Sequence, residues 1–233
     1  WSHHLPIFGY HKVGAFKGDH VPTVSPEAFE RQMSLLARFR YRVLSFDEAI
    51  ACLDRAEPLP RCSIVITFDD GYEETCTVAW PLLKRFGFPS TVFIAPGEVG
   101  RPGFVTWEQV GEMAKDGITI GSHTMHHSYL PLVKDEQLME ELAGSKQALE
   151  AAIKRPVHYL SYPVGGFTSQ AQAAARQAGY LAACTTNRAF LPVRVDRYAL
   201  RRIKMTERDA NPILLLAKAS GYYDLFRQPK HPS

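Results

Sequence analysis

Several features that define other protein classes are missing from this chain of 233 residues. It has no apolar run long enough to cross a membrane, and no cluster of basic residues stands out. The net charge of +3 is too small to argue for a nucleic-acid partner. Neither a low-complexity linker nor an internal repeat is present. We therefore expect one monomeric domain over residues 1–233, frayed from about residue 227, with no membrane span and no nucleic acid bound.

Cysteine is scarce and scattered, and no C-x-x-C motif occurs. We interpret the thiols as free and mostly buried, so they do not identify the compartment. The first residue is Trp1 rather than Met, so we expect a mature or trimmed form. Whether an upstream signal or anchor was removed is left open. The cysteines are Cys52, Cys62, Cys76 and Cys184.

Short β-branched runs alternate with helical patterns along the whole chain, and the composition is ordinary for a globular domain, with 45% hydrophobic residues. This alternation indicates an α/β domain with parallel strands. Motifs follow several different strands, which favours a barrel with one functional rim. Strands are expected at 5–11, 41–44, 63–68, 90–94, 118–121, 158–161, 181–184 and 198–200. Helices are expected from 26, 46, 72, 107, 134, 171 and 212.

The most informative stretch runs from Ser63 to Gly71, where a buried, β-branched run ends in two adjacent carboxylates and a glycine. We interpret it as a strand whose carboxyl end carries Asp69 and Asp70 out of the core. Chemistry in α/β folds is usually done at that end of the strands. A plain Asp-Gly turn is the alternative interpretation.

A second stretch, from Ile118 to His127, also begins with a β-branched run and ends in polar residues. His123 and His127 are four positions apart, so one helical turn would place both imidazoles on the same face. Two imidazoles and a carboxylate are a standard ligand set for a divalent transition metal. The pair alone would also suit a solvated helix face. Combined with the Asp pair, it predicts a metal site.

These motifs resemble those of the NodB-type polysaccharide deacetylases, carbohydrate esterase family four. The segment from Thr67 to Gly71 matches the first motif of the family, and the segment from His123 to His127 matches the second, H-[ST]-x-x-H. The opening from Pro6 to Val13 is similar to the branch that includes poly-N-acetylglucosamine deacetylases. The resemblance covers nearly the whole chain. It implies a distorted (β/α) barrel of about seven parallel strands and metal-dependent N-deacetylation of sugars.

By this resemblance, Asp69 is the general base, and the metal ligands are Asp70, His123 and His127. The chemistry agrees, because a bound divalent metal lowers the pKa of water and a neighbouring free carboxylate can take its proton. Zinc is the expected metal, with Co²⁺ or Ni²⁺ as alternatives. The same ligand set resembles the facial triad of iron(II) oxygenases, but such enzymes need a co-substrate site that we do not find in the sequence.

The third family motif is present as Ser161-Tyr162-Pro163-Val164-Gly165. Its Pro-x-Gly frame implies that the Val164 N–H is the oxyanion donor. Tyr162, Pro163 and Gly165 are expected to contact the substrate. A plain Pro-Gly turn is the alternative.

The sequence departs from the family at three places. Ser161 stands where the family usually has an arginine that orients the base, and Val164 replaces an aromatic residue. The fourth motif is usually an Asp followed by Trp, and Asp196-Arg197-Tyr198 matches it only in part. The histidine of the fifth motif, which supplies the general acid, has no convincing match, since His231 is too close to the end of the chain.

Two residues outside the motifs are candidates for the remaining roles. His11 follows the first expected strand, and we predict it as the replacement acid, with a hydrogen-bonded structural histidine as the alternative. Trp107 offers an aromatic face for a sugar ring, although core packing suits it equally.

The function expected from these residues is metal-dependent hydrolysis of the amide in an N-acylated amino sugar of a polysaccharide or surface glycan. Two alternatives stay open: a catalytically weak, carbohydrate-binding relative, and a small-molecule amide hydrolase on the same barrel. The resemblance implies a bacterial protein. Its compartment stays open between the periplasm, the cell surface and the cytoplasmic face of a membrane.

Overall fold

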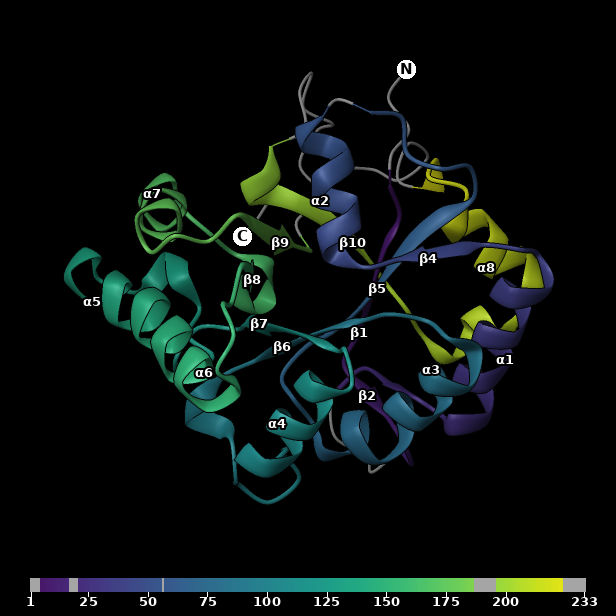
Figure 1. Ribbon diagram of the computed structural model, residues 1–233, viewed down its shortest axis with the longest axis horizontal. Coiled ribbons are helices and arrows are strands. Elements are labelled where there is room, and N and C mark those ends of the chain that lie inside the picture. The colour runs from purple at the N-terminus through teal and green to yellow at the C-terminus, as the bar shows by residue number, and fades with distance from the viewer. Residues whose placement is uncertain (1–4, 17–20, 56, 187–195, 224–233) are drawn as a thin grey trace.

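A closed barrel of seven parallel strands forms the centre of the computed structural model, which describes residues 5–16, 21–55, 57–186 and 196–223 (Figure 1). The strand order is β1, β10, β9, β8, β7, β6 and β5, and β5 pairs back to β1. The predicted barrel of about seven parallel strands is therefore confirmed. The strands are β1 (Ile7–Tyr10), β5 (Ser63–Phe68), β6 (Thr91–Ile94), β7 (Thr119–Ser122), β8 (Tyr159–Ser161), β9 (Ala182–Thr185) and β10 (Leu200–Lys204).

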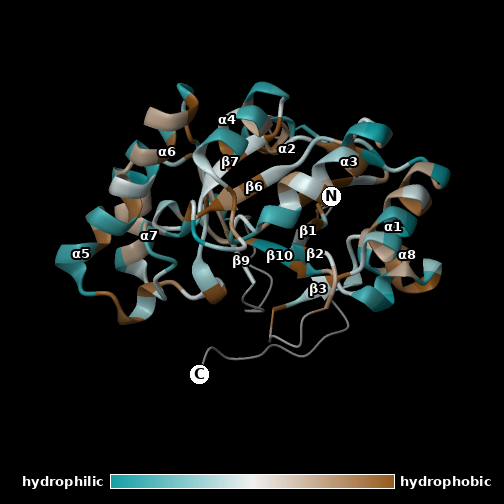
Figure 2. Cartoon of the chain, turned by 90° about the horizontal axis from the view of Figure 1, so that it is seen from below, coloured by the Kyte–Doolittle hydropathy of each residue, from teal (hydrophilic) through white to brown (hydrophobic). Residues whose placement is uncertain are grey.

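Three short strands and a ring of helices lie outside the barrel. β4 (Arg42–Leu44) pairs with the start of β5, and β2 (Lys12–Val13) pairs with β3 (Thr23–Val24). Figure 2 shows the helices around the strands, with hydrophilic colour at the outer edge of the ring, for example on α5. The helices of the described residues are α1 (Pro26–Arg38), α2 (Phe46–Asp54), α3 (Trp80–Phe86), α4 (Trp107–Lys115), α5 (Asp135–Met139), α6 (Ser145–Ile153), α7 (Ser169–Gln177) and α8 (Pro212–Ala219).

Side-chain caps fix the helix starts that the sequence predicts. Ser25 accepts a hydrogen bond from the Ala28 N–H at the start of α1. Ser45 and Thr106 open α2 and α4 with complete capping boxes, in which the third helical residue bonds back to the cap. These caps satisfy N–H groups that have no partner within the helix.

Two predicted helices are interrupted by a π-helical turn, which the sequence pattern did not indicate. The turn Thr75–Ala79 precedes α3, where Pro81 removes one N–H from the helical ladder. The turn Glu140–Gly144 divides the long helix expected over 134–154 into α5 and α6. A further difference is β10, which begins at Leu200, where the predicted strand over 198–200 ends.

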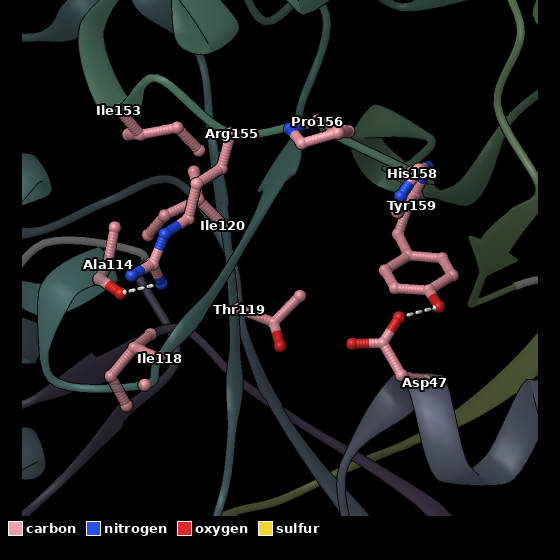
Figure 3. A pocket seen from close by; sticks show the side chains of 11 residues that line it. Asp47, Ala114, Ile118, Thr119, Ile120, Ile153, Arg155, Pro156, His158 and Tyr159 are labelled. Carbon is pink, nitrogen blue, oxygen red and sulfur yellow. Dashed lines mark hydrogen bonds between the residues drawn. The ribbon is translucent and has the colours of Figure 1, made fainter.

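The barrel is closed at its amino-terminal end by α2 and an apolar cluster. The Phe46 ring lies 4.5 Å from the Tyr159 ring and 6.2 Å from the Phe93 ring, and all three side chains are buried. A pocket of about 220 Å³ lies beside this closure, at the starts of β7 and β8 (Figure 3). There Tyr159 donates a hydrogen bond to Asp47, and Arg155 donates one to the Ala114 carbonyl. The Asp and His motifs lie at the opposite end of the strands.

The structure can be compared with the predictions of free, mostly buried thiols and of no membrane span. All four thiols are free, two of them are buried, and Cys62 is exposed, so the expectation of mostly buried thiols holds for half of them. Among the described residues, no helix is both long and apolar enough to cross a membrane.

Candidate active site

The two carboxylates that follow β5 have different partners. The Asp69 N–H donates to the Tyr10 carbonyl at 2.9 Å, which extends the pairing of β5 with β1. Asp70 then takes a left-handed φ of 71° and Gly71 one of 76°. A Cβ at Gly71 would lie 3.3 Å from Ile94 Cγ1, so the turn is tight. As a result, Asp69 stays buried while Asp70 reaches the partly exposed rim.

Asp70, His123 and His127 form a cluster with the spacing of metal ligands. Asp70 Oδ1 lies 3.3 Å from His123 Nε2 and 3.2 Å from His127 Nε2, and all three atoms lie within 4.8 Å of one another. Ligands about 2.0–2.2 Å from a shared ion have comparable separations. His123 Nδ1 lies 2.7 Å from the Ser161 carbonyl oxygen, a contact that orients Nε2 toward an ion. This donor set fits a divalent transition metal such as zinc.

The loop that carries both histidines is not a helical turn, which corrects the sequence prediction. His123 follows β7 directly, and residues 123–129 form no helix. Thr124 and His127 adopt left-handed φ angles of 62° and 56°. The Ser128 N–H donates to Thr124 Oγ1 at 3.0 Å. The two imidazoles therefore meet through a folded loop, with ring centroids 4.8 Å apart.

Asp69 is held by Arg202 of β10, a residue that the sequence analysis missed. Arg202 Nη1 and Nη2 donate to Asp69 Oδ1 and Oδ2 at 2.6 and 2.5 Å, and both side chains are almost completely buried. Nη2 also donates to Ser161 Oγ at 2.9 Å, and Nη1 to Thr67 Oγ1 at 3.2 Å. The guanidinium thus lies against Ser161, where the motif lacks its arginine. Both oxygens of Asp69 are occupied, which leaves Asp70 to face the histidines.

The charges around the two carboxylates keep both of them ionised. Burial alone would raise the pKa of Asp69, but the charges of Arg202 and His123 outweigh it and hold the pKa below its ordinary value. Burial also opposes ionisation of Asp70, and hydrogen bonds from His123 and His127 hold its pKa well below the usual range. The site therefore presents two anionic carboxylates, one bonded to a guanidinium and the other to two imidazoles.

A strained turn follows β8 at the third motif. Val164 has φ 57° and ψ 1°, a left-handed conformation that β-branched residues avoid. The turn is held by Gly165 N–H, which donates to the Tyr162 carbonyl at 2.9 Å, and by Thr185 Oγ1, which donates to the Gly165 carbonyl at 2.7 Å. The Val164 side chain is 75% exposed, so packing does not offset this strain.

His11 follows β1 and lies within the electrostatic field of the site. Its pKa is lowered chiefly by burial, while the charges of Asp69 and Asp70 act in the opposite direction. The charges of Arg202 and His123 lower the pKa of His11 further. The Nδ1 atom of His11 is buried and has no hydrogen-bond partner among the described residues. The role of His11 as the general acid stays a prediction, as does the alternative of a structural histidine bonded through its other ring nitrogen.

Comparison with known proteins identifies the family. Residues 56–183 match the family model described as polysaccharide deacetylase. A Bacillus subtilis (strain 168) protein named putative polysaccharide deacetylase YxkH is 33% identical over 203 residues, which cover 87% of this chain and 71% of that protein. The chain belongs to the polysaccharide deacetylases. These are hydrolases of carbon–nitrogen bonds other than peptide bonds, and divalent-metal dependence is a property of the family.

Two further similarities are to a relative whose name gives its substrate and to a solved structure. A Staphylococcus aureus (strain MRSA252) protein named poly-beta-1,6-N-acetyl-D-glucosamine N-deacetylase is 27% identical over 157 residues, covering 61% of this chain and 54% of that protein. The Streptococcus pyogenes deacetylase PplD in complex with acetate has a TM-score of 0.85 and 24% identity, covering 92% of this chain and 97% of that one. The second likeness shows that this polysaccharide deacetylase has the same fold as PplD.

Burial differs among the predicted substrate contacts of this family member, all of which stay predictions. The Tyr162 side chain is completely buried and stacks on Phe167 at 4.7 Å between ring centroids. Pro163 and Gly165 are buried as well, which leaves Val164 as the exposed residue of the motif. Trp107, the first residue of α4, is 41% exposed, and its contact with a sugar remains a prediction.

The loose match to the fourth motif has a structural role at a helix start. Asp196 accepts hydrogen bonds from the Tyr198 N–H and from Gln172 Nε2, so it caps the short 3₁₀ helix Arg197–Ala199. His231 and the chain from residue 227 lie outside the described residues.

Proposed function

We propose that the protein hydrolyses the amide of an N-acylated amino sugar in a polysaccharide or surface glycan, with a divalent metal held by Asp70, His123 and His127. One observation carries this proposal: of two adjacent carboxylates, Asp70 lies 3.3 and 3.2 Å from the two imidazoles, while both oxygens of Asp69 are bonded by Arg202. Arg202 holds Asp69 away from the imidazoles, so Asp69 is available as a base rather than as a metal ligand. Binding a sugar without catalysis would not require a buried, ionised carboxylate at this position.

A divalent ion in this site would supply Lewis acidity and lower the pKa of a water molecule. Asp69 is placed to take a proton from the attacking water. Each carboxylate oxygen has two lone pairs, so both oxygens can accept a bond from Arg202 and still accept a proton. Arg202 keeps Asp69 anionic and fixes its orientation. We therefore assign Asp69 as the general base and Arg202 as its positioning residue.

The remaining roles fall to the other side of the site. The water oxygen adds to the acyl carbonyl, and the Val164 N–H stabilises the negative charge that develops on the carbonyl oxygen. The bond between the acyl carbon and the sugar nitrogen then breaks, and the nitrogen takes a proton to leave as the free amine. We assign this proton to His11, because the charges of Asp69 and Asp70 favour its protonated form, against the burial that lowers its pKa, and its Nδ1 has no hydrogen-bond partner among the described residues.

The substrate class is supported by the Staphylococcus aureus relative, whose name gives a polymer of N-acetylated glucosamine. Zinc is supported by the donor set of two imidazole nitrogens and one carboxylate oxygen. The exposed Val164 and Trp107 side chains offer apolar surface that could contact a sugar ring.

The test is amine release from N-acetylated glucosamine oligomers with β-1,6 and β-1,4 linkages, with zinc or cobalt added. We expect Asp69→Asn to lower kcat by roughly 10²–10⁴-fold while bound metal stays stoichiometric. Asp70→Asn should instead lose the metal and the activity together. Stoichiometric metal in the native protein with no release from any oligomer would reject the deacetylase assignment in favour of a binding protein.

A further inference from the structure

The loop between the two histidine ligands has a conformation that needs support from outside. Thr124 and His127 both lie in the left-handed region, which costs a non-glycine residue about 1–2 kcal/mol. Such strain persists only where the surroundings hold the backbone in place. The question is which residues hold the histidine loop, defined here as residues 123–128.

Glu141 is a buried carboxylate that bonds directly to this loop. Its Oε2 accepts hydrogen bonds from the Met125 N–H at 3.0 Å and from the His126 N–H at 3.1 Å. Its Oε1 lies 2.8 Å from His126 Nδ1. The two backbone donors belong to the residues between the ligands, so the carboxylate fixes the peptide units that join His123 to His127.

The π-helical turn Glu140–Gly144 brings this carboxylate to the loop. Ser145, the next residue, lies 2.8 Å from Ser122 between hydroxyl oxygens, so the helix also contacts the last residue of β7, directly before His123. A Cβ on Gly144 would lie 3.3 Å from the Met125 Cε, which indicates close packing of the helix on the loop. Extra residues in a helical turn are frequent at functional sites.

A second contact holds the same peptide from the other side. The Gly97 N–H donates to the Met125 carbonyl at 2.8 Å, and a Cβ on Gly97 would lie 2.8 Å from that oxygen. Met125 is therefore held at its N–H by Glu141 and at its carbonyl by Gly97. Residue 97 must remain glycine for this approach.

We propose that Glu141 is a positioning residue that preorganises the histidine loop for metal binding. The proposal rests on the metal site of the proposed function, but it concerns affinity for the ion rather than turnover. Glu141 touches neither ligand side chain, and it acts through the backbone of Met125 and His126. Partners that orient the ligands of a metal site commonly change affinity by about 10–100-fold when removed.

The test measures metal binding and folding separately in four variants. Zn²⁺ affinity is obtained by competition with a chromophoric chelator, and the geometry of the site is followed by the visible absorption of bound Co²⁺. Glu141→Ala should weaken Zn²⁺ binding by about 10–100-fold and change the Co²⁺ spectrum. Glu141→Gln keeps one acceptor oxygen for the two N–H groups, so it should recover much of the affinity.

Two matched controls separate positioning from general stability. Glu140→Ala removes the exposed carboxylate next in sequence and should leave affinity and spectrum unchanged. His126→Ala removes the side-chain contact but keeps both backbone bonds, so its effect should be smaller than that of Glu141→Ala. If Glu141→Ala does not fold, Glu141→Gln decides: it should bind Zn²⁺ more weakly than both the native protein and His126→Ala, because only Glu141→Gln alters the acceptor of the two backbone bonds. A folded Glu141→Gln protein that binds Zn²⁺ as tightly as the native protein would then overturn the proposal.

The outcomes are distinct from those of the deacetylase test. A folded Glu141→Ala protein with native Zn²⁺ affinity and a native Co²⁺ spectrum would overturn the proposal, and so would a native protein that binds neither ion. Weakened binding in that variant supports it even if the native protein turns over no sugar in the panel. In that case the proposed function would fail and the positioning role of Glu141 would stand.

Discussion

The two ends of the barrel differ in the side chains and backbone conformations that they contain. The amino-terminal end is closed by aromatic packing of Phe46 on Tyr159 and Phe93. The opposite rim contains the buried pair of Asp69 and Arg202 and the cluster of Asp70 with two histidines. One end is held by apolar contacts that no reaction uses, and the other contains charges that would be costly to bury without their partners.

Backbone strain is distributed in the same uneven way. Of the seven non-glycine residues with positive φ in the described part of the chain, four belong to the candidate site. Two of the other three, Arg40 and Lys154, lie at the ends of helices, where a left-handed residue is the usual way to stop. The four strained residues at the rim do not end helices. We explain their left-handed conformations by the need to place the side chains and N–H groups of the candidate site. The four are Asp70, Thr124, His127 and Val164.

Removing Arg202 should have the largest effect and should damage the rim in both stability and activity. Arg202→Met leaves Asp69 buried without its partner, and we expect a loss of about 3–5 kcal/mol in the free energy of unfolding, measured by urea titration. Amine release should fall by at least roughly 10²-fold, because the base loses its orientation. A variant with near-native activity would show that Asp69 needs no guanidinium.

A double variant sharpens this prediction. Arg202→Ser combined with Ser161→Arg moves the guanidinium to the strand where the family motif has it. The exchange is feasible because the Arg202 and Ser161 side chains are already in contact. We expect part of the activity lost in Arg202→Ser alone to return. No recovery in a folded double variant would show that the direction from which the arginine approaches is itself required.

Changing the closed end should affect stability alone. Phe46→Ala removes a buried ring from the cluster under α2, and we expect a loss of about 3–5 kcal/mol in the free energy of unfolding. The activity of the folded fraction should remain close to native, because the Phe46 ring packs on Tyr159 and Phe93, and only Phe93 of these lies near a rim residue, with Arg202 5.5 Å from its ring centroid. A fall in kcat at a temperature where the protein is fully folded would contradict the separation of the two ends.

The smallest effect is expected at Val164, with an opposite sign. Val164→Gly relieves the left-handed strain and should raise the free energy of unfolding by about 1 kcal/mol while lowering kcat, since the turn becomes less rigid. Lys154→Gly is the matched control at the closed end of the molecule, and it should stabilise the protein without changing activity. Unchanged kcat in Val164→Gly would exclude a catalytic reason for the strain.

The sequence predicted most of the fold because its signals were local. Ser45 and Thr106 are each followed three residues later by Glu48 and Gln109, and that spacing alone identifies a capping box. The β-branched runs before Asp69 and His123 likewise indicated strands. Each of the three candidate metal ligands lies in a short motif, so the sequence could point to them, and the structure brings them together.

The parts that the sequence did not predict depend on contacts between distant residues. Arg202 and Asp69 are 133 positions apart in the sequence. The strand of Arg202 reads Leu-Arg-Arg-Ile-Lys, and its three charged residues do not suggest a buried strand. The conformation of the histidine loop could not be read from Thr124 and His127, because neither residue type favours a left-handed φ as glycine does. The bonds from Glu141 to this loop likewise depend on an unpredicted π-helical turn.

β4 has a consequence for how copies of the molecule meet. Because β1 pairs with β5, the barrel strands form a closed ring, and β4 is the terminal strand of the eight-stranded sheet. It is three residues long, and it begins with exposed Arg42, which pairs with Glu48 at 3.5 Å. Short edges with a charge are poor templates for strand addition. We therefore expect this edge to resist aggregation through β-sheet extension, even at high protein concentration.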